Sequence, residues 1–374
     1  MKTIKDVDIA NKRVIIRLDL NVPIKDNVIL DDTRIVKSLK TLEYVLDRAS
    51  KVIILSHLGR IKTTIDKEKN SLKIVCDYLS KLIKEDIAFC DYNDLSIIEN
   101  NKIIMMENTR YFDLDNNKES NCDEELSKYF ASFGDIFIND AFGVSHRSNA
   151  SNVGICKYIE SCNGFLMEEE INNLNKLLIS PERPYVVIMG GKKVSDKIKV
   201  IDNLIKKVDK LLIGGALAYT FLKAKGINVG SSFIEEDYIL YAKELLDKYP
   251  GKIVLPVDNF IQNNSLKDIN NMDLNDIGFD IGKKTVYNYK EELKSSKTIF
   301  FNGPVGAFEN GYSYGTKELC EYLNSLKSYV VIGGGDTLNA VNSYAPNNNF
   351  VISTGGGASL EYLEGKKLPG IVEE

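Results

Sequence analysis

The chain has 374 residues, which is too long for one ordinary domain of about 100 to 200 residues and predicts two domains. Hydrophobic residues make up 44% and charged residues 27%, a balance that excludes disorder as the main state. The 48 Lys and Arg face 53 Asp and Glu, and the net charge of −5 argues against a nucleic acid or an anionic membrane as partner.

The cysteines and histidines disfavour further classes of chemistry. The six cysteines form no C-x-x-C motif, which is typical of reduced thiols and argues against a zinc or redox role. With only His57 and His146, a His-ligated metal or a histidine relay is disfavoured. The N-terminal residues lack the apolar run of a secretory signal, and no stretch approaches the roughly 18 apolar residues of a membrane span. We therefore expect a cytoplasmic protein.

Short apolar runs alternate with helical patterns along the chain. Residues 13–18 predict a strand, residues 33–48 a helix and residues 51–55 the next strand, which is a βαβ rhythm. Further predicted strands are 102–106, 135–138, 185–189, 210–213, 252–255, 298–301, 329–332 and 350–353. Near-continuous apolar runs suit parallel strands covered by helices on both faces, so the sequence predicts an α/β protein.

A helical pattern separates two groups of predicted strands. It covers about residues 163–179 and is followed by a Pro-rich stretch at 180–184, so we place the domain junction there. Three Asn-rich stretches, at residues 116–121, 262–275 and 347–349, predict surface loops.

The residues that directly follow the predicted strands differ between the two halves. Asp19, Asn21, His57 and Arg60 follow strands in the first half, and seven of the eight arginines lie within the first 150 residues. In the second half the strands are followed by glycine-rich turns, at residues 190–191, 214–215, 302–304, 333–336 and 355–357. Ligands bind outside the carboxyl ends of parallel strands, and both arginines and bare backbone amides bind anions. We therefore expect an anionic substrate on the first half and a nucleotide on the second.

The sequence does not match the familiar motifs of nucleotide-binding proteins and hydrolases in their expected context. It contains no P-loop and no G-x-G-x-x-G after a strand, which disfavours a nicotinamide dehydrogenase. Ser313 sits in a G-x-S-x-G pattern at residues 311–315. No apolar strand directly precedes it and no histidine follows it, so we do not interpret it as a nucleophile.

Taken together, the motifs give the chain a family resemblance. The matching segments are Arg17–Pro23, Ser56–Arg60, Glu107–Arg110, Asn139–Gly143 with His146–Arg147, Gly190–Lys197, Gly214–Phe221, Asn302–Glu309, Gly333–Thr337 and Ser353–Ser359. In these segments, which extend over essentially its whole length, the chain resembles phosphoglycerate kinase.

The resemblance implies a fold and a reaction. It implies two Rossmann-like, doubly wound parallel-sheet domains that face each other across a cleft, with a hinge helix at about 163–179. Residues 1–165, with a C-terminal tail of 365–374, would bind phosphoglycerate, and residues 166–364 would bind the Mg-nucleotide. The implied reaction is reversible phosphoryl transfer between 1,3-bisphosphoglycerate and ADP, in line and after domain closure, by a monomer with small-molecule partners and Mg²⁺. Its acceptor in reverse is an ionised carboxylate, which needs no general base and accounts for the scarcity of histidine.

Motif matching also implies site residues. The substrate would contact Asp19, Leu20, Asn21, Arg34, His57, Leu58, Gly59, Arg60, Arg110 and Arg147. The nucleotide would contact Lys197, Gly214, Gly215, Gly278, Asn302, Glu309, Gly334, Gly335, Asp336 and Thr337, with Asp336 receiving Mg²⁺ largely through the phosphates. The groups at the transferring phosphoryl would be Arg34, Lys193, Lys197, Gly356 and Gly357. Lys193 and Lys197 are four residues apart, so at a helix start they would project to one side.

Each assignment has a structural alternative. An arginine can form a surface ion pair, Asp336 can be a helix N-cap, and the lysines can form a solvated face. The chain also departs from the family pattern at Leu20, Ile61, Asn149 and Lys192. The functional alternative to the kinase is a non-catalytic nucleotide-binding protein that retains the fold.

Overall fold

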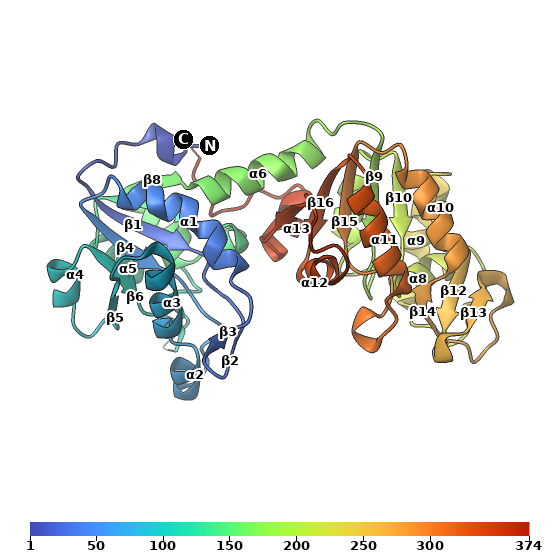
Figure 1. Cartoon of the computed structure of the whole chain (residues 1–374), viewed down its shortest axis with the longest axis horizontal. Coiled ribbons are helices and arrows are strands. Elements are labelled where there is room, and N and C mark those ends of the chain that lie inside the picture. Colours follow the sequence, from blue (N-terminus) through green and yellow to red (C-terminus); the bar gives the residue numbers. More distant parts are fainter. Residues whose placement is uncertain (115, 374) are drawn as a thin grey trace. The chain divides into compact units, whose positions relative to one another are not determined.

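A computed structural model describes residues 1–114 and 116–373 of the chain. They form two compact units (Figure 1). The first unit is Met1–Asn172 together with the C-terminal segment from Lys367 onward, and the second is Asn173–Lys366. The chain therefore passes between the units twice, once within a helix and once near its end.

The first unit is built on a six-stranded sheet. Its strands are β1 (Arg13–Leu18), β4 (Lys51–Leu55), β5 (Ala88–Cys90), β6 (Ile103–Met106), β7 (Ile136–Asp140) and β8 (Glu160–Asn163), in the order β5-β6-β4-β1-β7-β8 with every neighbouring pair parallel. Its helices are α1 (Thr33–Leu46), α2 (Thr64–Lys69), α3 (Lys73–Ile83), α4 (Ser96–Asn100) and α5 (Glu124–Ala131), and β2 (Ile24–Lys25) pairs with β3 (Val28–Ile29) in a small hairpin. Neither β5 nor β8 was predicted from the sequence.

Alternate residues of the central strand explain its unbroken apolar sequence. Val14 and Ile16 of β1 belong to a core cluster with residues of α1 and α3, whereas Ile15 belongs to a second cluster with residues of α5. The sheet therefore has helices on both faces, and each face buries one side of the strand. This covering confirms the expected parallel α/β class.

The second unit repeats this architecture. Its main sheet contains β9 (Tyr185–Met189), β10 (Lys210–Ile213), β11 (Ile253–Val254), β15 (Thr298–Asn302), β16 (Tyr329–Gly333) and β17 (Val351–Ser353), in the all-parallel order β11-β10-β9-β15-β16-β17. Its helices are α7 (Ile198–Leu204), α8 (Leu217–Ala224), α9 (Ile239–Lys248), α10 (Lys283–Leu293), α11 (Tyr314–Ser325), α12 (Gly335–Tyr344) and α13 (Gly357–Leu363). From β9 the chain first builds one side of the sheet and then the other, which is the doubly wound order with its switch point between β9 and β15.

A small antiparallel sheet lies beside the main sheet of the second unit (Figure 1). In it, β12 (Asp258–Ile261) pairs with β13 (Leu266–Asp268) and with β14 (Gly278–Ile281). The prediction of a surface loop over 262–275 is therefore wrong in part, because this stretch contains β13 and two buried side chains, Ile269 and Met272.

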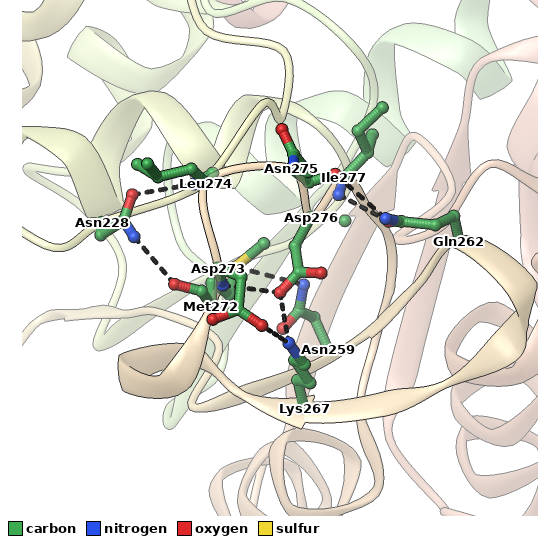
Figure 2. A network of polar contacts seen from close by, with 12 residues as sticks. Asn228, Asn259, Gln262, Lys267, Met272, Asp273, Leu274, Asn275, Asp276 and Ile277 are labelled. Carbon is green, nitrogen blue, oxygen red and sulfur yellow. Dashed lines mark hydrogen bonds and ion pairs between the residues drawn. The ribbon is translucent and has the colours of Figure 1, made fainter.

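Polar side chains hold the rest of that stretch in place (Figure 2). Asn228 Nδ2 donates to the carbonyl of Met272 at 2.8 Å, and Gln262 bonds the backbone of Asn275 and Ile277 at 3.0 and 2.7 Å. Here amide side chains bond backbone groups that no neighbouring strand pairs with. These bonds explain why an Asn-rich sequence is ordered in this stretch.

The helix α6 (Phe165–Leu178) contains the border between the two units. Its first turn is capped by Asp140, whose Oδ1 accepts hydrogen bonds from the backbone N–H groups of Leu166 and Met167 at 2.9 and 3.2 Å. Asp140 is part of β7, which is longer than predicted because Asn139 and Asp140 still pair with β1. Burial raises the pKa of Asp140 to about 6.

Both chain ends lie in the first unit, next to each other (Figure 1). The N–H of Lys2 donates to the carbonyl of Val372 at 3.3 Å. Asn163, which is buried at the end of β8, donates to the carbonyls of Lys2 and Val372 at 2.7 and 2.8 Å and accepts from the N–H of Val372 at 3.0 Å. One amide side chain thus joins both termini to the sheet.

We predict that Asn163→Ala destabilises the protein by about 2 to 4 kcal/mol, because it removes three hydrogen bonds to the terminal segments and leaves the backbone N–H of Val372 without its partner. Urea unfolding of the whole chain measures this change. Asn101→Ala is the control, since Asn101 is exposed and makes one bond within its own helix end, to Ile97. Equal free energies of unfolding for the two variants would contradict the prediction.

Candidate functional site

Three residues that follow β1 or begin α1 meet in the first unit. Arg34 Nη1 donates to a carboxylate oxygen of Asp19 at 3.1 Å and to the carbonyl of Asn21 at 3.2 Å. Asn21 Oδ1 in turn accepts from the N–H of Gly59, after β4, at 2.9 Å. The structure therefore brings together residues from the ends of two parallel strands and the start of a helix. The side chains of Leu20 and Leu58 are buried in the apolar core of the first unit.

A basic pocket lies beside this group, with a volume of about 160 Å³. The part of its lining that the structure describes includes Arg60, Arg110, Arg147 and Lys62, and among these described residues Asp113 is the one carboxylate. That carboxylate already accepts two hydrogen bonds, from the N–H and the hydroxyl of Ser120 at 2.8 and 2.6 Å. Four cations around a small hollow with little opposing charge form a site for a small anion.

The three arginines of the pocket are held differently. Arg110 is largely buried and its Nη1 donates to the carbonyl of Gly59, whereas Arg60 and Arg147 are exposed. Burial, and after it the like charges of Arg147 and Arg17, lowers the pKa of Arg110. The like charges therefore repel each other without a ligand, and an anion in the pocket would relieve that repulsion.

His57 is buried at the end of β4 and is neutral. Burial and, after it, the charge of Arg17 and three further arginines hold the pKa of His57 well below its usual value. Its Nδ1 lies 3.1 Å from Arg17 Nη2, which can only donate. Nδ1 is therefore the acceptor and the ring proton is on Nε2, so His57 can donate a hydrogen bond but does not act as a base.

Arg17 is held by residues that sequence reasoning missed. Its guanidinium is fully buried, and its Nε donates to Ser151 Oγ at 3.0 Å. Ser151 donates through both its hydroxyl and its N–H to the buried carboxylate of Glu119. The prediction of a surface loop over 116–121 is thus wrong for Glu119. Its place in an Asn-rich stretch hid it, and no local sequence signal marks it as buried.

Glycines allow the turns after β9, β10 and β15 to approach one another in the second unit. Gly303 has φ +91°, and a Cβ there would lie 2.4 Å from the carbonyl oxygen of Gly190. Gly215 has φ +67°, and a Cβ there would lie 2.5 Å from the carbonyl oxygen of Gly191. Side chains would force these turns apart, so glycine is required at the switch point of the sheet.

Lys197 lies at this switch point. Its Nζ donates to Asn302 Oδ1 at the end of β15, and burial lowers its pKa, against the opposing effect of Asp196 and Asp336. The expectation that Lys193 and Lys197 project from a helix start is wrong, because α7 begins at Ile198 and Lys197 is its N-cap. Lys193 is exposed on the preceding irregular segment.

Asp336 and Thr337 occupy the first turn of α12. Asp336 is exposed, and the hydroxyl of buried Thr337 accepts from the N–H of Gly303 at 2.7 Å. Gly334 is the N-cap of this helix and Gly335 its first residue, while Gly356 and Gly357 have the same places in α13. Among the described residues no group of three or more His, Cys, Asp or Glu side chains could hold a metal ion. A lone carboxylate nevertheless suits Mg²⁺ that is bound mainly by phosphates.

Three of the remaining expected nucleotide residues lie elsewhere in the second unit. Gly278 is buried in β14 and donates to Ser232 Oγ at 3.0 Å, and Glu309 is exposed in a 3-10 turn after β15. Gly214 packs against Val305, which a Cβ would approach to 2.6 Å. No helix in the described part of the chain is long and apolar enough to cross a membrane.

Comparisons with known proteins agree over nearly the whole chain. The family model described as phosphoglycerate kinase matches residues 4–366. The phosphoglycerate kinases of Fusobacterium nucleatum and Enterococcus faecalis are each 47% identical to this chain, over 99% of its length and 98% of theirs. The solved phosphoglycerate kinase structure from Coxiella burnetii has a TM-score of 0.88 at 36% identity, and that from Pyrococcus horikoshii OT3 has 0.83 at 30%. Each covers 99% of this chain and 97% of its own.

We predict that the imidazole of His57 does not titrate between pH 5 and 8, because its pKa is depressed by burial and neighbouring arginines. The ring nitrogen signals of ¹⁵N-histidine-labelled protein test this, and His57→Gln identifies the signal to follow. The expected spectrum is that of a neutral ring protonated on Nε2 at every pH in this range. Protonation of His57 near pH 6.5 would contradict the prediction.

Proposed function

The chain belongs to the phosphoglycerate kinase family, and we propose how its residues carry out that family's reaction, reversible phosphoryl transfer between 1,3-bisphosphoglycerate and ADP. The enzyme is a phosphotransferase with a carboxyl group as acceptor. The observation that carries the assignment of roles is the basic pocket lined by Arg60, Arg110 and Arg147. Its size and charge suit one phosphate group on a small substrate.

The first unit binds the phosphoglycerate in this proposal. The basic pocket receives the 3-phosphate, and neutral His57 donates from Nε2 to a substrate oxygen. Asp19 and Asn21 orient the glycerate hydroxyl and the carboxyl end, which accepts the phosphoryl group from ATP. Arg34, which bonds Asp19 and Asn21, is assigned to the transferring phosphoryl oxygens, whose charge its guanidinium stabilises.

The second unit binds the nucleotide phosphates. Lys193 and Lys197 neutralise phosphate charge, and the backbone amides at the starts of α12 and α13 add hydrogen bonds. Asp336 would hold Mg²⁺ together with the phosphates, and the ion would supply charge neutralisation on the phosphoryl oxygens. Gly214, Gly215, Gly278, Asn302 and Glu309 are assigned to the base, ribose and phosphate contacts.

The reaction needs positioning rather than proton abstraction. A carboxylate acceptor is ionised at neutral pH, so the arginines, lysines and amides only align the reactants and stabilise charge. Direct in-line transfer requires both substrates to meet with water excluded, so the proposal includes an approach of the two units during turnover. We further propose a cytoplasmic monomer with small-molecule partners only.

A coupled assay for ATP-dependent phosphorylation of 3-phosphoglycerate tests the proposal. Turnover that requires Mg²⁺ is the expected result. Folded protein that binds MgADP but shows no turnover would instead favour the non-catalytic alternative, a nucleotide-binding protein that retains the fold.

Arg147→Ala is predicted to raise KM for 3-phosphoglycerate about tenfold and to leave KM for MgATP unchanged, since it removes one charge-assisted bond to the phosphate. Steady-state kinetics with each substrate varied in turn provide the measurement. Arg48→Ala is the control, because Arg48 is also a partly exposed arginine of the first unit but stacks on Tyr44 outside the pocket. Unchanged kinetic constants in the Arg147→Ala variant would exclude the Arg147 side chain from the substrate site.

Lys197→Met is predicted to lower kcat about a hundredfold by removing a cation from the transferring phosphate. The same substitution is not expected to lower the stability of the folded protein. Burial lowers the pKa of Lys197, so its charged form is disfavoured in the folded state and its removal should leave the melting temperature unchanged or higher. Normal kcat, or loss of activity only in parallel with unfolding, would reject the assignment.

A further inference from the structure

The segment 192–197, which carries Lys193 and Lys197, is irregular backbone between β9 and α7. Such a segment has no helix or strand ladder of its own to fix where its ammonium groups lie. Groups that bind a phosphate chain must nevertheless adopt one position. If they do so only when the ligand binds, the loss of conformational entropy reduces the affinity. Contacts from outside the segment therefore decide how well it is prepared for a ligand.

Glu235 makes one contact of this kind. One of its carboxylate oxygens accepts from the N–H of Ser195 at 3.1 Å, and the other accepts from the hydroxyl of Ser195 at 2.6 Å. Ser195 lies midway between Lys193 and Lys197, so this two-pronged contact fixes the centre of the segment. Glu235 is itself anchored, because its N–H donates to the hydroxyl of buried Thr220 in α8 at 3.1 Å.

Phe233 makes a second contact, at the start of the segment. The Nζ of Lys192 lies 5.1 Å from the centroid of the Phe233 ring, within the range of a cation–π interaction. Lys192 is one of the positions at which this chain departs from the family pattern. Residues 233 and 235 thus hold the lysine segment at two points.

The charge of Glu235 is directed at Ser195 rather than at a lysine. Among the described residues no ion pair within 4.0 Å links Glu235 to Lys192, Lys193 or Lys197. The carboxylate can therefore reduce repulsion within the segment while the ammonium groups stay available for an anion. A direct ion pair would instead compete with the phosphates.

We infer that Phe233 and Glu235 form a clamp that positions Lys193 and Lys197 for the nucleotide phosphates. Glu235 is a positioning residue in this inference, since it acts through Ser195. The inference rests on the proposed function for the role of the two lysines. It adds to that proposal a determinant of nucleotide affinity outside the residues that would touch the ligand.

Glu235→Ala and Ser195→Ala test the clamp. Each should raise KM for MgATP and the dissociation constant for MgADP, with Glu235→Ala changing both about tenfold and KM for 3-phosphoglycerate staying the same. Glu235→Gln should restore both values to within about threefold, because its amide can accept from the N–H and donate to the hydroxyl of Ser195. Phe233→Leu should give a rise of only about two- to fivefold, the size of an exposed cation–π contact.

Asp94→Ala is the matched control. Asp94 Oδ1 accepts from both the N–H and the hydroxyl of Ser96, at 3.1 and 2.5 Å, in the first unit. It should leave both nucleotide constants unchanged. Equal changes for both substrates in Glu235→Ala, a lowered melting temperature with unchanged nucleotide constants, or failure of Glu235→Gln to restore them would overturn the inference. Calorimetric MgADP binding needs no turnover, so an inactive wild type would reject the proposed function and still leave the clamp testable.

Discussion

Parallel pairing of the strands is the constraint on which both functional regions depend. Every strand of the two main sheets runs in the same direction as its neighbours, so all strands of a sheet end at one edge. Residues far apart in the sequence, such as Asn21 and Gly59 or Lys197 and Asn302, are thereby brought into contact. Since parallel strands need long crossovers, helices cover the faces and leave this edge as the place for polar side chains.

The same constraint explains how far sequence alone predicts the site. Arg60 and Arg110 follow strands β4 and β6. Once the sheet is known to be parallel, these positions predict that the two arginines line one pocket. Glu119 could not be found this way, because it belongs to a polar loop and the partner of its buried carboxylate, Ser151, is distant in the sequence. The roles assigned to the site residues stay predictions, because geometry alone does not test them.

The errors in the predicted fold have a common cause. Composition predicts a loop over 262–275, yet amide side chains there bond the backbone and allow β13 to pair with β12. The four-residue spacing of Lys193 and Lys197 likewise predicts that both project from a helix start, whereas α7 begins at Ile198 and Glu235 bonds Ser195 in the irregular segment before it. In both places tertiary hydrogen bonds to side chains override the local signal, and a single sequence does not reveal such partners.

The return of the C-terminus to the first unit has a consequence for biosynthesis. Asn139 Nδ2 donates to the carbonyl of Gly370 at 2.7 Å, and the N–H of Gly370 donates to Ser145 at 2.9 Å. A nascent chain emerges from the ribosome N-terminus first, so the whole second unit is translated before these partners exist. The first unit therefore completes its hydrogen bonding only after the second unit has been translated, and until then it folds without this segment.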